Sequence, residues 1–253
     1  MDLGLEGLKA LVTGGTRGIG RAIVDRLAAE GCAIALCARN GDEVQAAVGA
    51  LEADGAKATG AAVDVADGPA LKAWVDAAAQ ALGGIDIVVA NVSGMGSTLG
   101  DEGWRRGFEI DIMGTVHTVE AAMPCLEKSE AASIVAISST AALESFGGVR
   151  PYNSVKAAVV NYMSSLSSAL AGNGVRANTV SPGTIYFEDG VWGQRKREQP
   201  EIFEWALSRN PTGRMGRPDE VANATVFLAS PAASFISGAN LVVDGAMTTR
   251  VQF

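Results

Sequence analysis

The sequence predicts a single α/β domain in which a parallel sheet of about seven strands is covered by helices on both faces. Short apolar runs alternate along the chain with longer stretches whose apolar residues recur at helical spacing. The runs are apolar on both of their sides, which is typical of parallel strands buried between two layers of helices. No repeat, linker or low-complexity tract interrupts the chain, so residues 1–253 are expected to form one domain.

Seven apolar runs fit buried strands. The run Ile85–Ala90 is the clearest of them, the run Lys57–Asp64 is weaker, and the first ends at the glycine pair Gly14 and Gly15. The expected strands are Lys9–Thr13, Ala33–Ala38, Lys57–Asp64, Ile85–Ala90, Ile134–Ile137, Val175–Val180 and Leu241–Val243.

Six stretches between these runs fit helices. The first carries apolar residues at Ile19, Ile23, Val24 and Leu27 and stops at Gly31. Prolines suit the first turn of the third and of the last helix. The expected helices are Ile19–Glu30, Glu43–Asp54, Pro69–Leu82, Gly103–Leu126, Tyr152–Ala171 and Asp219–Ala229.

The stretch from about residue 184 to 210 is irregular, aromatic and basic. Long ordered insertions of this kind are often lids, so we expect a substrate lid there. The alternative is a pair of surface helices packed on the sheet, with a solvated basic face. The residues concerned are Tyr186, Phe187, Trp192, Phe203 and Trp205 and the basic run Arg195, Lys196 and Arg197.

Composition excludes several classes of function. The chain has 20 Lys and Arg against 28 Asp and Glu, and this net charge of −8 disfavours nucleic acids and anionic membranes as partners. No apolar run approaches the roughly 20 residues that a membrane span requires, and the N-terminus lacks a signal-peptide pattern. The three cysteines are expected to be buried, reduced thiols in a cytoplasmic protein.

The segment Thr13–Gly20, TGGTRGIG, follows the first expected strand and opens the first expected helix. Glycines let the backbone approach a pyrophosphate closely, and the helix N-terminus supplies free N–H groups. This placement predicts a dinucleotide-binding loop in a doubly wound, Rossmann-like fold. The loop residues expected to bind the cofactor are Gly14, Thr16, Arg17, Gly18, Ile19 and Gly20.

The residues after the second strand favour NADP(H) as the dinucleotide. A site for NAD usually has a carboxylate there, which binds the ribose hydroxyls of the adenosine. Here Ala38 is followed by Arg39 and Asn40, and Arg17 supplies a second cation. A guanidinium pairs with a 2′-phosphate, whereas a carboxylate repels it. Arg39 and Asn40 are therefore expected to bind NADP(H).

Tyr152 and Lys156 are four residues apart and share one face of the expected helix. Alone, such a pair is more often a surface pair. This helix, however, follows the strand Ile134–Ile137, whose end carries Ser138 and Ser139, in a dinucleotide-binding sheet. The context indicates a reactive site.

Together these motifs resemble the short-chain dehydrogenase/reductase family over nearly the whole chain. The matching stretches are Thr13–Gly20, Asp64–Val65, Asn91 with Gly94, Ile137–Ser139, Tyr152–Lys156, Ser181–Gly183, Asn210–Pro218 with Val221–Ala222, Phe227–Ser230 and Val243–Gly245. The resemblance implies that Ser139, Tyr152 and Lys156 are catalytic and that Ser138 has another role. It further implies cofactor contacts from Asp64, Val65, Asn91, Tyr152, Lys156, Pro182, Gly183 and Ile185.

The chemistry explains these residue types. Reducing a ketone needs a hydride from the nicotinamide and a proton, which a tyrosine hydroxyl can donate. The reverse reaction needs a phenolate, although the reference pKa of tyrosine is about 10. A cation about 4 Å away, at an effective dielectric of about 20, supplies roughly the 4 kcal/mol that brings this value near neutrality. Lys156 is the candidate cation, and Ser139 is expected to hold the substrate oxygen.

Three positions depart from the family pattern. Asp111 stands where the family usually has an asparagine of the proton relay. We expect it to complete the catalytic set and to raise the pKa of Lys156. The fourth strand ends in Asn91–Gly94, NVSG, which reshapes the pocket floor, and Phe187 stands where a threonine often contacts the cofactor.

The sequence thus predicts an oxidoreductase that transfers hydride between NADP(H) and a carbonyl compound or secondary alcohol. The basic residues Arg195 and Arg197 leave a 3-oxoacyl thioester reductase as an alternative, and Asp111 leaves a non-catalytic NADPH-binding sensor. An aromatic or bulky apolar substrate is expected from a pocket of Leu143, Phe146, Tyr186, Phe187 and Trp192.

No metal site is expected, because His117 is the only histidine. The family resemblance implies a homodimer or homotetramer, and the apolar face of Val155–Leu170 is broad enough for both core and partner. In a tetramer the tail Met247–Phe253 is expected to reach a neighbour's pocket.

Overall fold

A computed structural model describes residues 1–94, 99–145 and 148–251, in which seven strands form one sheet. The strands are β1 (Lys9–Thr13), β2 (Ala33–Ala38), β3 (Ala58–Ala62), β4 (Ile87–Ala90), β5 (Ser133–Ile137), β6 (Arg176–Pro182) and β7 (Asn240–Val243). The helices are α1 (Gly18–Ala29), α2 (Gly41–Ala53), α3 (Gly68–Leu82), α4 (Gly100–Gly107), α5 (Gly114–Leu126), α6 (Pro151–Leu170), α7 (Val191–Glu198), α8 (Pro200–Ser208) and α9 (Pro218–Ala229).

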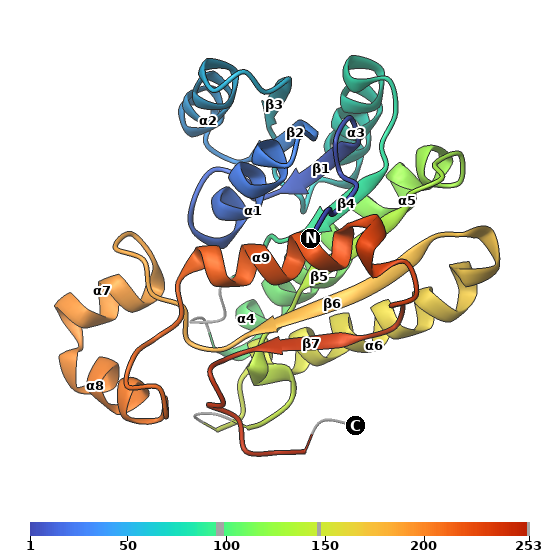
Figure 1. The fold of residues 1–253 in the computed structure, drawn as a ribbon. Helices are drawn as coiled ribbons and strands as arrows, with labels where there is room; N and C mark the ends of the chain where they lie inside the picture. The colour runs from blue at the N-terminus through green and yellow to red at the C-terminus, as the bar shows by residue number, and fades with distance from the viewer. Residues whose placement is uncertain (95–98, 146–147, 252–253) are drawn as a thin grey trace.

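The strand order is β3-β2-β1-β4-β5-β6-β7, so the chain starts inside the sheet and builds outward in two directions (Figure 1). Every pair of neighbouring strands is parallel, and Val12 of β1 lies beside Leu36 of β2 and Val89 of β4. The direction of building reverses between β1 and β4, and in such sheets ligands bind beyond the carboxyl ends of those strands. The doubly wound α/β fold expected from the sequence is confirmed.

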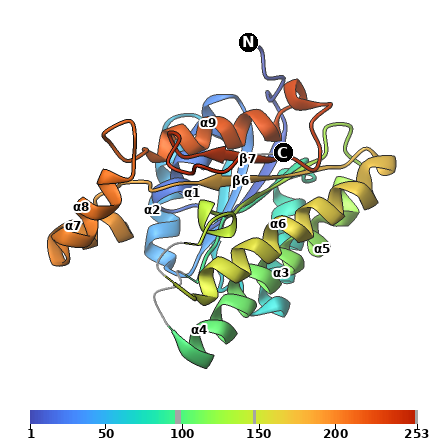
Figure 2. The ribbon, with the colours of Figure 1, turned by 90° about the horizontal axis from the view of Figure 1, so that it is seen from below.

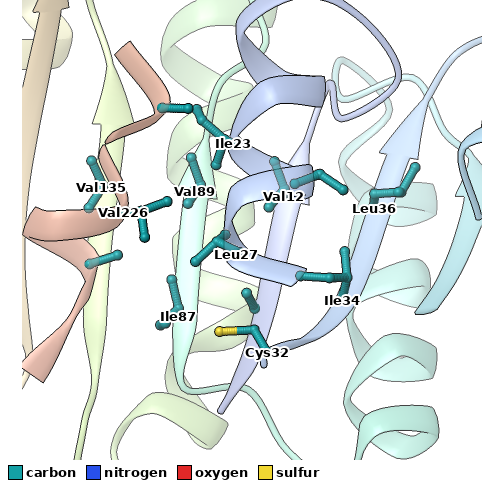
Figure 3. Packing of buried hydrophobic residues seen from close by; sticks show 14 of the residues in the cluster. Val12, Ile23, Leu27, Cys32, Ile34, Leu36, Ile87, Val89, Val135 and Val226 are labelled. Atoms are coloured by element: carbon teal, nitrogen blue, oxygen red, sulfur yellow. The ribbon is translucent and has the colours of Figure 1, made fainter. Parts of the chain in front are cut away.

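Successive residues of a strand pack into two hydrophobic cores, one on each face of the sheet. On one face Val12 and Val89 pack with α1, α2 and α9 around Leu27 and Val226 (Figure 3). On the other face Leu11 packs with α3, α5 and α6. Figure 2 shows these helices on either side of the strands. No helix in the described ranges combines the length and the apolar character needed to cross a membrane.

The longest expected helix, Gly103–Leu126, is three consecutive segments. The helix α4 leads into a π-helix, Phe108–Met113, which leads into α5. A π-helix has more residues per turn than an α-helix. The apolar spacing expected of one continuous α-helix therefore does not show where the π-helix begins and ends. The other expected elements end within two residues of the observed ones.

The stretch expected to form a lid contains α7 and α8, which project from one end of the molecule (Figure 1). A small hydrophobic cluster lies between them, separate from the two cores of the sheet. It consists of Phe203, Ala206 and Met215, with Tyr186, Trp192 and Leu207 packed against it. The helix pair therefore packs largely on itself, not flat on the sheet as the alternative interpretation expects.

Candidate active site

The glycine loop between β1 and α1 is tied closely to its neighbours. The N–H groups of Gly14 and Gly15 donate to the carbonyl oxygen of Cys37, at 2.8 and 3.2 Å. A methyl group at Gly20 would overlap the carbonyl oxygen of Gly14. Gly18 has a φ of +54°, a left-handed conformation that side chains other than glycine rarely adopt. The glycines are required by this close, tightly turned backbone.

The start of α1 fits the pyrophosphate of a dinucleotide. Its N-cap residue Arg17 makes no side-chain bond to the first turn, so the N–H groups there are left for a ligand. The helix dipole adds positive potential at the same end. Ile19 and Gly20 belong to this turn, whose glycines carry no side chains of their own, and the ring of Phe187 lies against Gly18.

Asn91, at the end of β4, holds the glycine loop in place. Its side-chain amide donates to the carbonyl oxygens of Thr13 and Gly14, at 3.3 and 3.1 Å. Its backbone N–H donates to the hydroxyl of Thr13 at 3.1 Å. A residue expected to line the adenosine ribose therefore also fixes the loop at the switch point of the sheet.

At the end of β2, a carboxylate bridges the two segments expected to bind the adenosine ribose. The hydroxyl of Thr16 donates to Oε2 of Glu43 at 3.0 Å, and the amide of Asn40 donates to Oε1 at 3.3 Å. Asn40 also caps α2 through its Oδ1. Arg17 and Arg39 are exposed beside this pair. Sequence reasoning missed Glu43, although its spacing from Asn40 is that of a capping residue and its partner.

The other expected cofactor residues end β3 and β6. Oδ1 of the exposed Asp64 accepts from the N–H two residues ahead, at 3.0 Å, and so caps a turn. Val65 is buried in the core beneath α3 and α5. Pro182 ends β6, the N–H of Gly183 donates to a carbonyl at the end of β7 at 3.0 Å, and Ile185 is buried. All five residues thus lie at the carboxyl edge of the sheet.

Lys156 is 2% exposed, and its ammonium group has two partners among the described residues. Nζ lies 2.9 Å from Oδ1 of Asp111 and donates to the carbonyl oxygen of Ile137 at 3.0 Å. The ring centroid of Tyr152 is 5.9 Å from Nζ. Burial alone would lower the pKa of Lys156, but the charges of Asp111 and Tyr152 outweigh it and raise this pKa above its ordinary value. The expected effect of Asp111 on Lys156 is confirmed.

Asp111 lies in the π-helix and is 1% exposed. Its Oδ2 accepts from the N–H of Gly94 at 2.8 Å, and its backbone carbonyl accepts from the hydroxyl of Thr115 at 2.7 Å. A Cβ at Gly94 would stand 3.2 Å from Oδ2, so glycine permits the close approach. π-helical turns are frequent at functional sites, and this one joins Lys156 to the end of β4.

The two serines after β5 make different contacts. The hydroxyl of the buried Ser138 donates to the backbone carbonyl of Lys156 at 2.9 Å and ties β5 to α6. The half-buried Ser139 accepts at Oγ from the N–H of Ala141, at 3.1 Å. Because Oγ accepts this bond, the O–H of Ser139 can still donate to a substrate oxygen.

A cavity of about 10 Å³ lies beside Tyr152 and Asp111. That volume holds about one water molecule and no substrate. Its lining is completed by Gly94, Gly103, Arg106, Gly107 and Val155. A single water in this cavity would lie beside the side chains of Asp111 and Tyr152.

The described residues do not gather the expected aromatic pocket. Tyr186 and Trp192 pack instead in the cluster of α7 and α8. The ring of Phe187 lies over the glycine loop, where a methyl group at Gly18 would meet its edge. Phe146 lies outside the described residues. Phe187 therefore lies beside the loop that is expected to bind the pyrophosphate.

Two of the basic residues of α7 interact within the helix pair. The guanidinium of Arg197 lies 2.9 Å from the carboxylate of Glu188. That of Arg195 lies over the ring of Trp192, 4.8 Å from its centroid. Arg195 is half-exposed and has no ion pair among the described residues, so it is the better placed of the two for an anionic group of a ligand.

Comparison with known proteins covers nearly the whole chain. The profile of a family described as enoyl-(acyl carrier protein) reductase matches residues 14–248. Isoepoxydon dehydrogenase from Penicillium expansum is 41% identical over 257 residues, covering 100% of this chain and 99% of that protein.

Two solved structures share the fold at similar coverage. An NADPH-bound short chain oxidoreductase from Pseudomonas aeruginosa PAO1, described as containing an atypical catalytic center, is 32% identical with a TM-score of 0.90. The match covers 96% of this chain and 98% of that one. L-sorbose reductase from Gluconobacter frateurii, in complex with NADPH and L-sorbose, is 30% identical with a TM-score of 0.91, over 99% and 100% of the two chains. By profile, identity and structure, the chain belongs to the short-chain dehydrogenase/reductase family.

Proposed function

We propose that the protein transfers hydride between NADP(H) and a carbonyl compound or secondary alcohol. The observation that carries this proposal is the buried ammonium of Lys156, held against Tyr152 at the carboxyl end of β5. The glycine loop and the uncapped start of α1 stand at the same edge of the sheet. Relatives named as dehydrogenases and reductases support oxidoreduction with a pyridine nucleotide.

Each polar side chain of the reactive group has a distinct task. The bound nicotinamide supplies or accepts the hydride. In reduction, Tyr152 donates its hydroxyl proton to the substrate oxygen, and in oxidation its phenolate takes that proton back. Lys156 stabilises the phenolate by its charge, and Ser139 donates a hydrogen bond that holds the substrate oxygen. Asp111 keeps Lys156 protonated and, with one water in the adjacent cavity, offers a route for proton exchange.

The preference for NADP(H) is proposed from the two exposed guanidinium groups at its adenosine end. Arg17 and Arg39 flank the place where the ribose of a dinucleotide lies in such sheets. Guanidinium pairs with a 2′-phosphate in a forked geometry. Two related structures contain NADPH, which supports the same preference.

The substrate is proposed at the level of a ketone or its alcohol. The aromatic or bulky apolar substrate expected from the sequence is one class, and α7 and α8 are proposed as its lid. A relative in complex with L-sorbose, a polyhydroxylated ketone, favours a small oxygenated substrate instead. A 3-oxoacyl thioester is a third class, supported by the half-exposed Arg195 and by the name of the matching family profile.

The test is oxidation of NADPH, with NADH in parallel, over aromatic ketones, aliphatic ketones, polyhydroxylated ketones and 3-oxoacyl thioesters. Tyr152→Phe removes the proton donor and should lower turnover at least about 100-fold, the usual scale of acid–base catalysis. Its dissociation constant for NADPH, measured by fluorescence, should stay within about twofold, because this side chain is not the anchor of the cofactor.

Tyr162→Phe is the matched control, since Tyr162 lies on the same helix α6 and packs against the core beneath it. It should turn over like the parent protein. Wild-type turnover in Tyr152→Phe would contradict the proposed mechanism. Binding of NADPH with no turnover of any ketone, even after Asp111→Asn, would favour the sensor.

A further inference from the structure

The carboxylate of Glu43 occupies the junction between the glycine loop and the end of β2. Thr16 belongs to the loop and Asn40 follows β2, and Glu43 accepts from both, at 3.0 and 3.3 Å. Its side chain is half-buried at the start of α2. One negative group therefore connects the two segments between which the adenosine ribose of a dinucleotide lies.

Two cationic residues neighbour the partners of Glu43 in the sequence. Arg17 is the neighbour of Thr16, Arg39 is the neighbour of Asn40, and both guanidinium groups are exposed. A 2′-phosphate is attracted by these cations and repelled by Glu43. A free 2′-hydroxyl gains from a carboxylate, which accepts its hydrogen bond as the acidic residue of NAD sites does. The two cofactors thus find different partners in the same place.

Glu43 stands later in the chain than the usual acidic position at the end of the strand. The strand ends at Ala38 and Arg39 follows it, so the sequence around β2 points to NADP(H). In the folded chain, Glu43 in the first turn of α2 brings a carboxylate to the same place, where it accepts a hydrogen bond from Thr16.

We propose that Glu43 sets the balance between the two cofactors, weakening NADP(H) and supporting NAD(H), so that the chain accepts both. This inference rests on the proposed function, because it concerns the adenosine end of the same cofactor site. Binding of a 2′-phosphate requires the hydroxyl of Thr16 to turn from Glu43 toward the phosphate. Neutralising Glu43 removes both the repulsion and the competition for this hydroxyl.

The experiment uses fragments that carry only the adenosine end of the cofactors. Dissociation constants of adenosine 2′,5′-bisphosphate and of adenosine 5′-phosphate are measured by calorimetry at low salt, for the full chain and for Glu43→Gln. Glutamine keeps the length and the acceptor oxygen but removes the charge. Affinity for the bisphosphate should rise about fivefold, the effect of one unit charge about 4 Å away in water. Affinity for the monophosphate should stay level or fall.

Asp42→Asn is the matched control, because Asp42 carries the same charge in the same turn, and none of its side-chain contacts among the described residues reaches Thr16. Glu43→Ala is a second variant that removes the charge and favours the helix. A rise of about threefold or more in the ratio of the two affinities, in both Glu43 variants but not in the control, supports the proposal. A smaller change, or the same change in Asp42→Asn, overturns it.

Failure of the proposed function gives a different result. If the protein binds neither the fragments nor NADPH and NADH, the site is not a dinucleotide site at all. If it binds them and the Glu43 variants keep the parental ratio, the cofactor site stands and only the role of Glu43 is wrong.

Discussion

At the scale of single residues, the direct contact between Lys156 and Asp111 sets the charge around Tyr152. A buried ammonium paired with a carboxylate is neutral as a unit, so it stabilises a phenolate less than a lone cation does. The same pairing raises the pKa of Lys156 and keeps its ammonium charged at neutral pH. Asp111 therefore secures the charge of the lysine while weakening its effect on the tyrosine.

Asp111→Asn should move the acidic limb of the pH–rate profile for alcohol oxidation to lower pH by roughly one unit. Asparagine carries no charge, so the field of Lys156 acts on Tyr152 without compensation. The measurement is kcat/KM against pH. Thr115→Val is the control, because it removes only the hydroxyl bound to the backbone carbonyl of Asp111. If the acidic limb does not move in Asp111→Asn, the charge of Asp111 has no effect on Tyr152.

The same substitution has a signature in stability. Because the pKa of Lys156 is raised in the folded protein, the pair's contribution is fully present below the ordinary lysine pKa of 10.5. It is lost as the pH rises through the raised value. Asp111→Asn should lower the free energy of unfolding by about 1–3 kcal/mol at neutral pH, since asparagine retains an acceptor. Urea unfolding of the two proteins should give converging values at strongly alkaline pH.

Sequence reasoning placed Asp111, Ser139, Tyr152 and Lys156 in one site, because motifs fix positions along the chain, and their catalytic roles stay predictions. It missed the bond from Lys156 to the carbonyl of Ile137 and the contact between Glu43 and Thr16. Both depend on the direction of a side chain across two elements. Spacing in the sequence carries no information about that direction.

At the scale of elements, the C-terminal tail lies across the loop that follows β5. The N–H groups of Thr249 and Arg250 donate to one oxygen of Glu144, at 2.8 and 3.0 Å. The described part of the tail thus contacts its own chain, and residues 252–253 of the segment expected to reach a neighbour lie outside the described residues. Glu144 follows shortly after Ser139, so the tail restrains the loop that carries this serine.

Glu144→Ala should raise KM for the carbonyl substrate about threefold to tenfold, because two bonds to a charged acceptor are lost and the loop loosens. The dissociation constant for NADPH should not change, since the glycine loop is untouched. Glu144→Gln, which keeps an acceptor oxygen, serves as the control. Its KM should lie between that of the parent protein and that of Glu144→Ala. If Glu144→Ala has the same KM as the parent protein in steady-state kinetics, the tail does not affect substrate binding.

Strands and most helices could be predicted, because apolar runs and helical spacing directly express burial. The π-helix at Phe108–Met113 could not be predicted, because its turns contain more residues than the α-helical turns that the spacing argument assumes. The helices α7 and α8 were expected only in the alternative interpretation of residues 184–210, since their apolar residues face a small cluster of their own.

At the scale of the whole molecule, two cores share the strands of one sheet, so we expect them to unfold together. Leu36 and Leu11 are fully buried on opposite faces of neighbouring strands. Loss of either core exposes the same strands to water.

Association into a dimer or tetramer stays a prediction. It is supported by Trp104 on α4 and Phe108 on the π-helix, whose side chains are about half exposed, and mass photometry can check it.

Leu11→Ala and Leu36→Ala should each lower the free energy of unfolding by about 2–5 kcal/mol, as large-to-small changes at fully buried sites do. Each variant should still unfold in one transition. Far-UV circular dichroism and tryptophan fluorescence, followed during the same urea titration, should therefore coincide. Separate transitions in Leu36→Ala would mean that one face can melt while the other stays folded.

The strand order has one more consequence. The residues proposed to discriminate the adenosine end of the cofactor come from the half of the sheet that runs outward from β1, namely Thr16, Arg39 and Glu43. The residues proposed for the chemistry, Ser139, Tyr152 and Lys156, come from the half that runs outward from β4. Evolution, or an engineer building chimaeras, can therefore exchange one half to change the coenzyme while the other half keeps its chemistry.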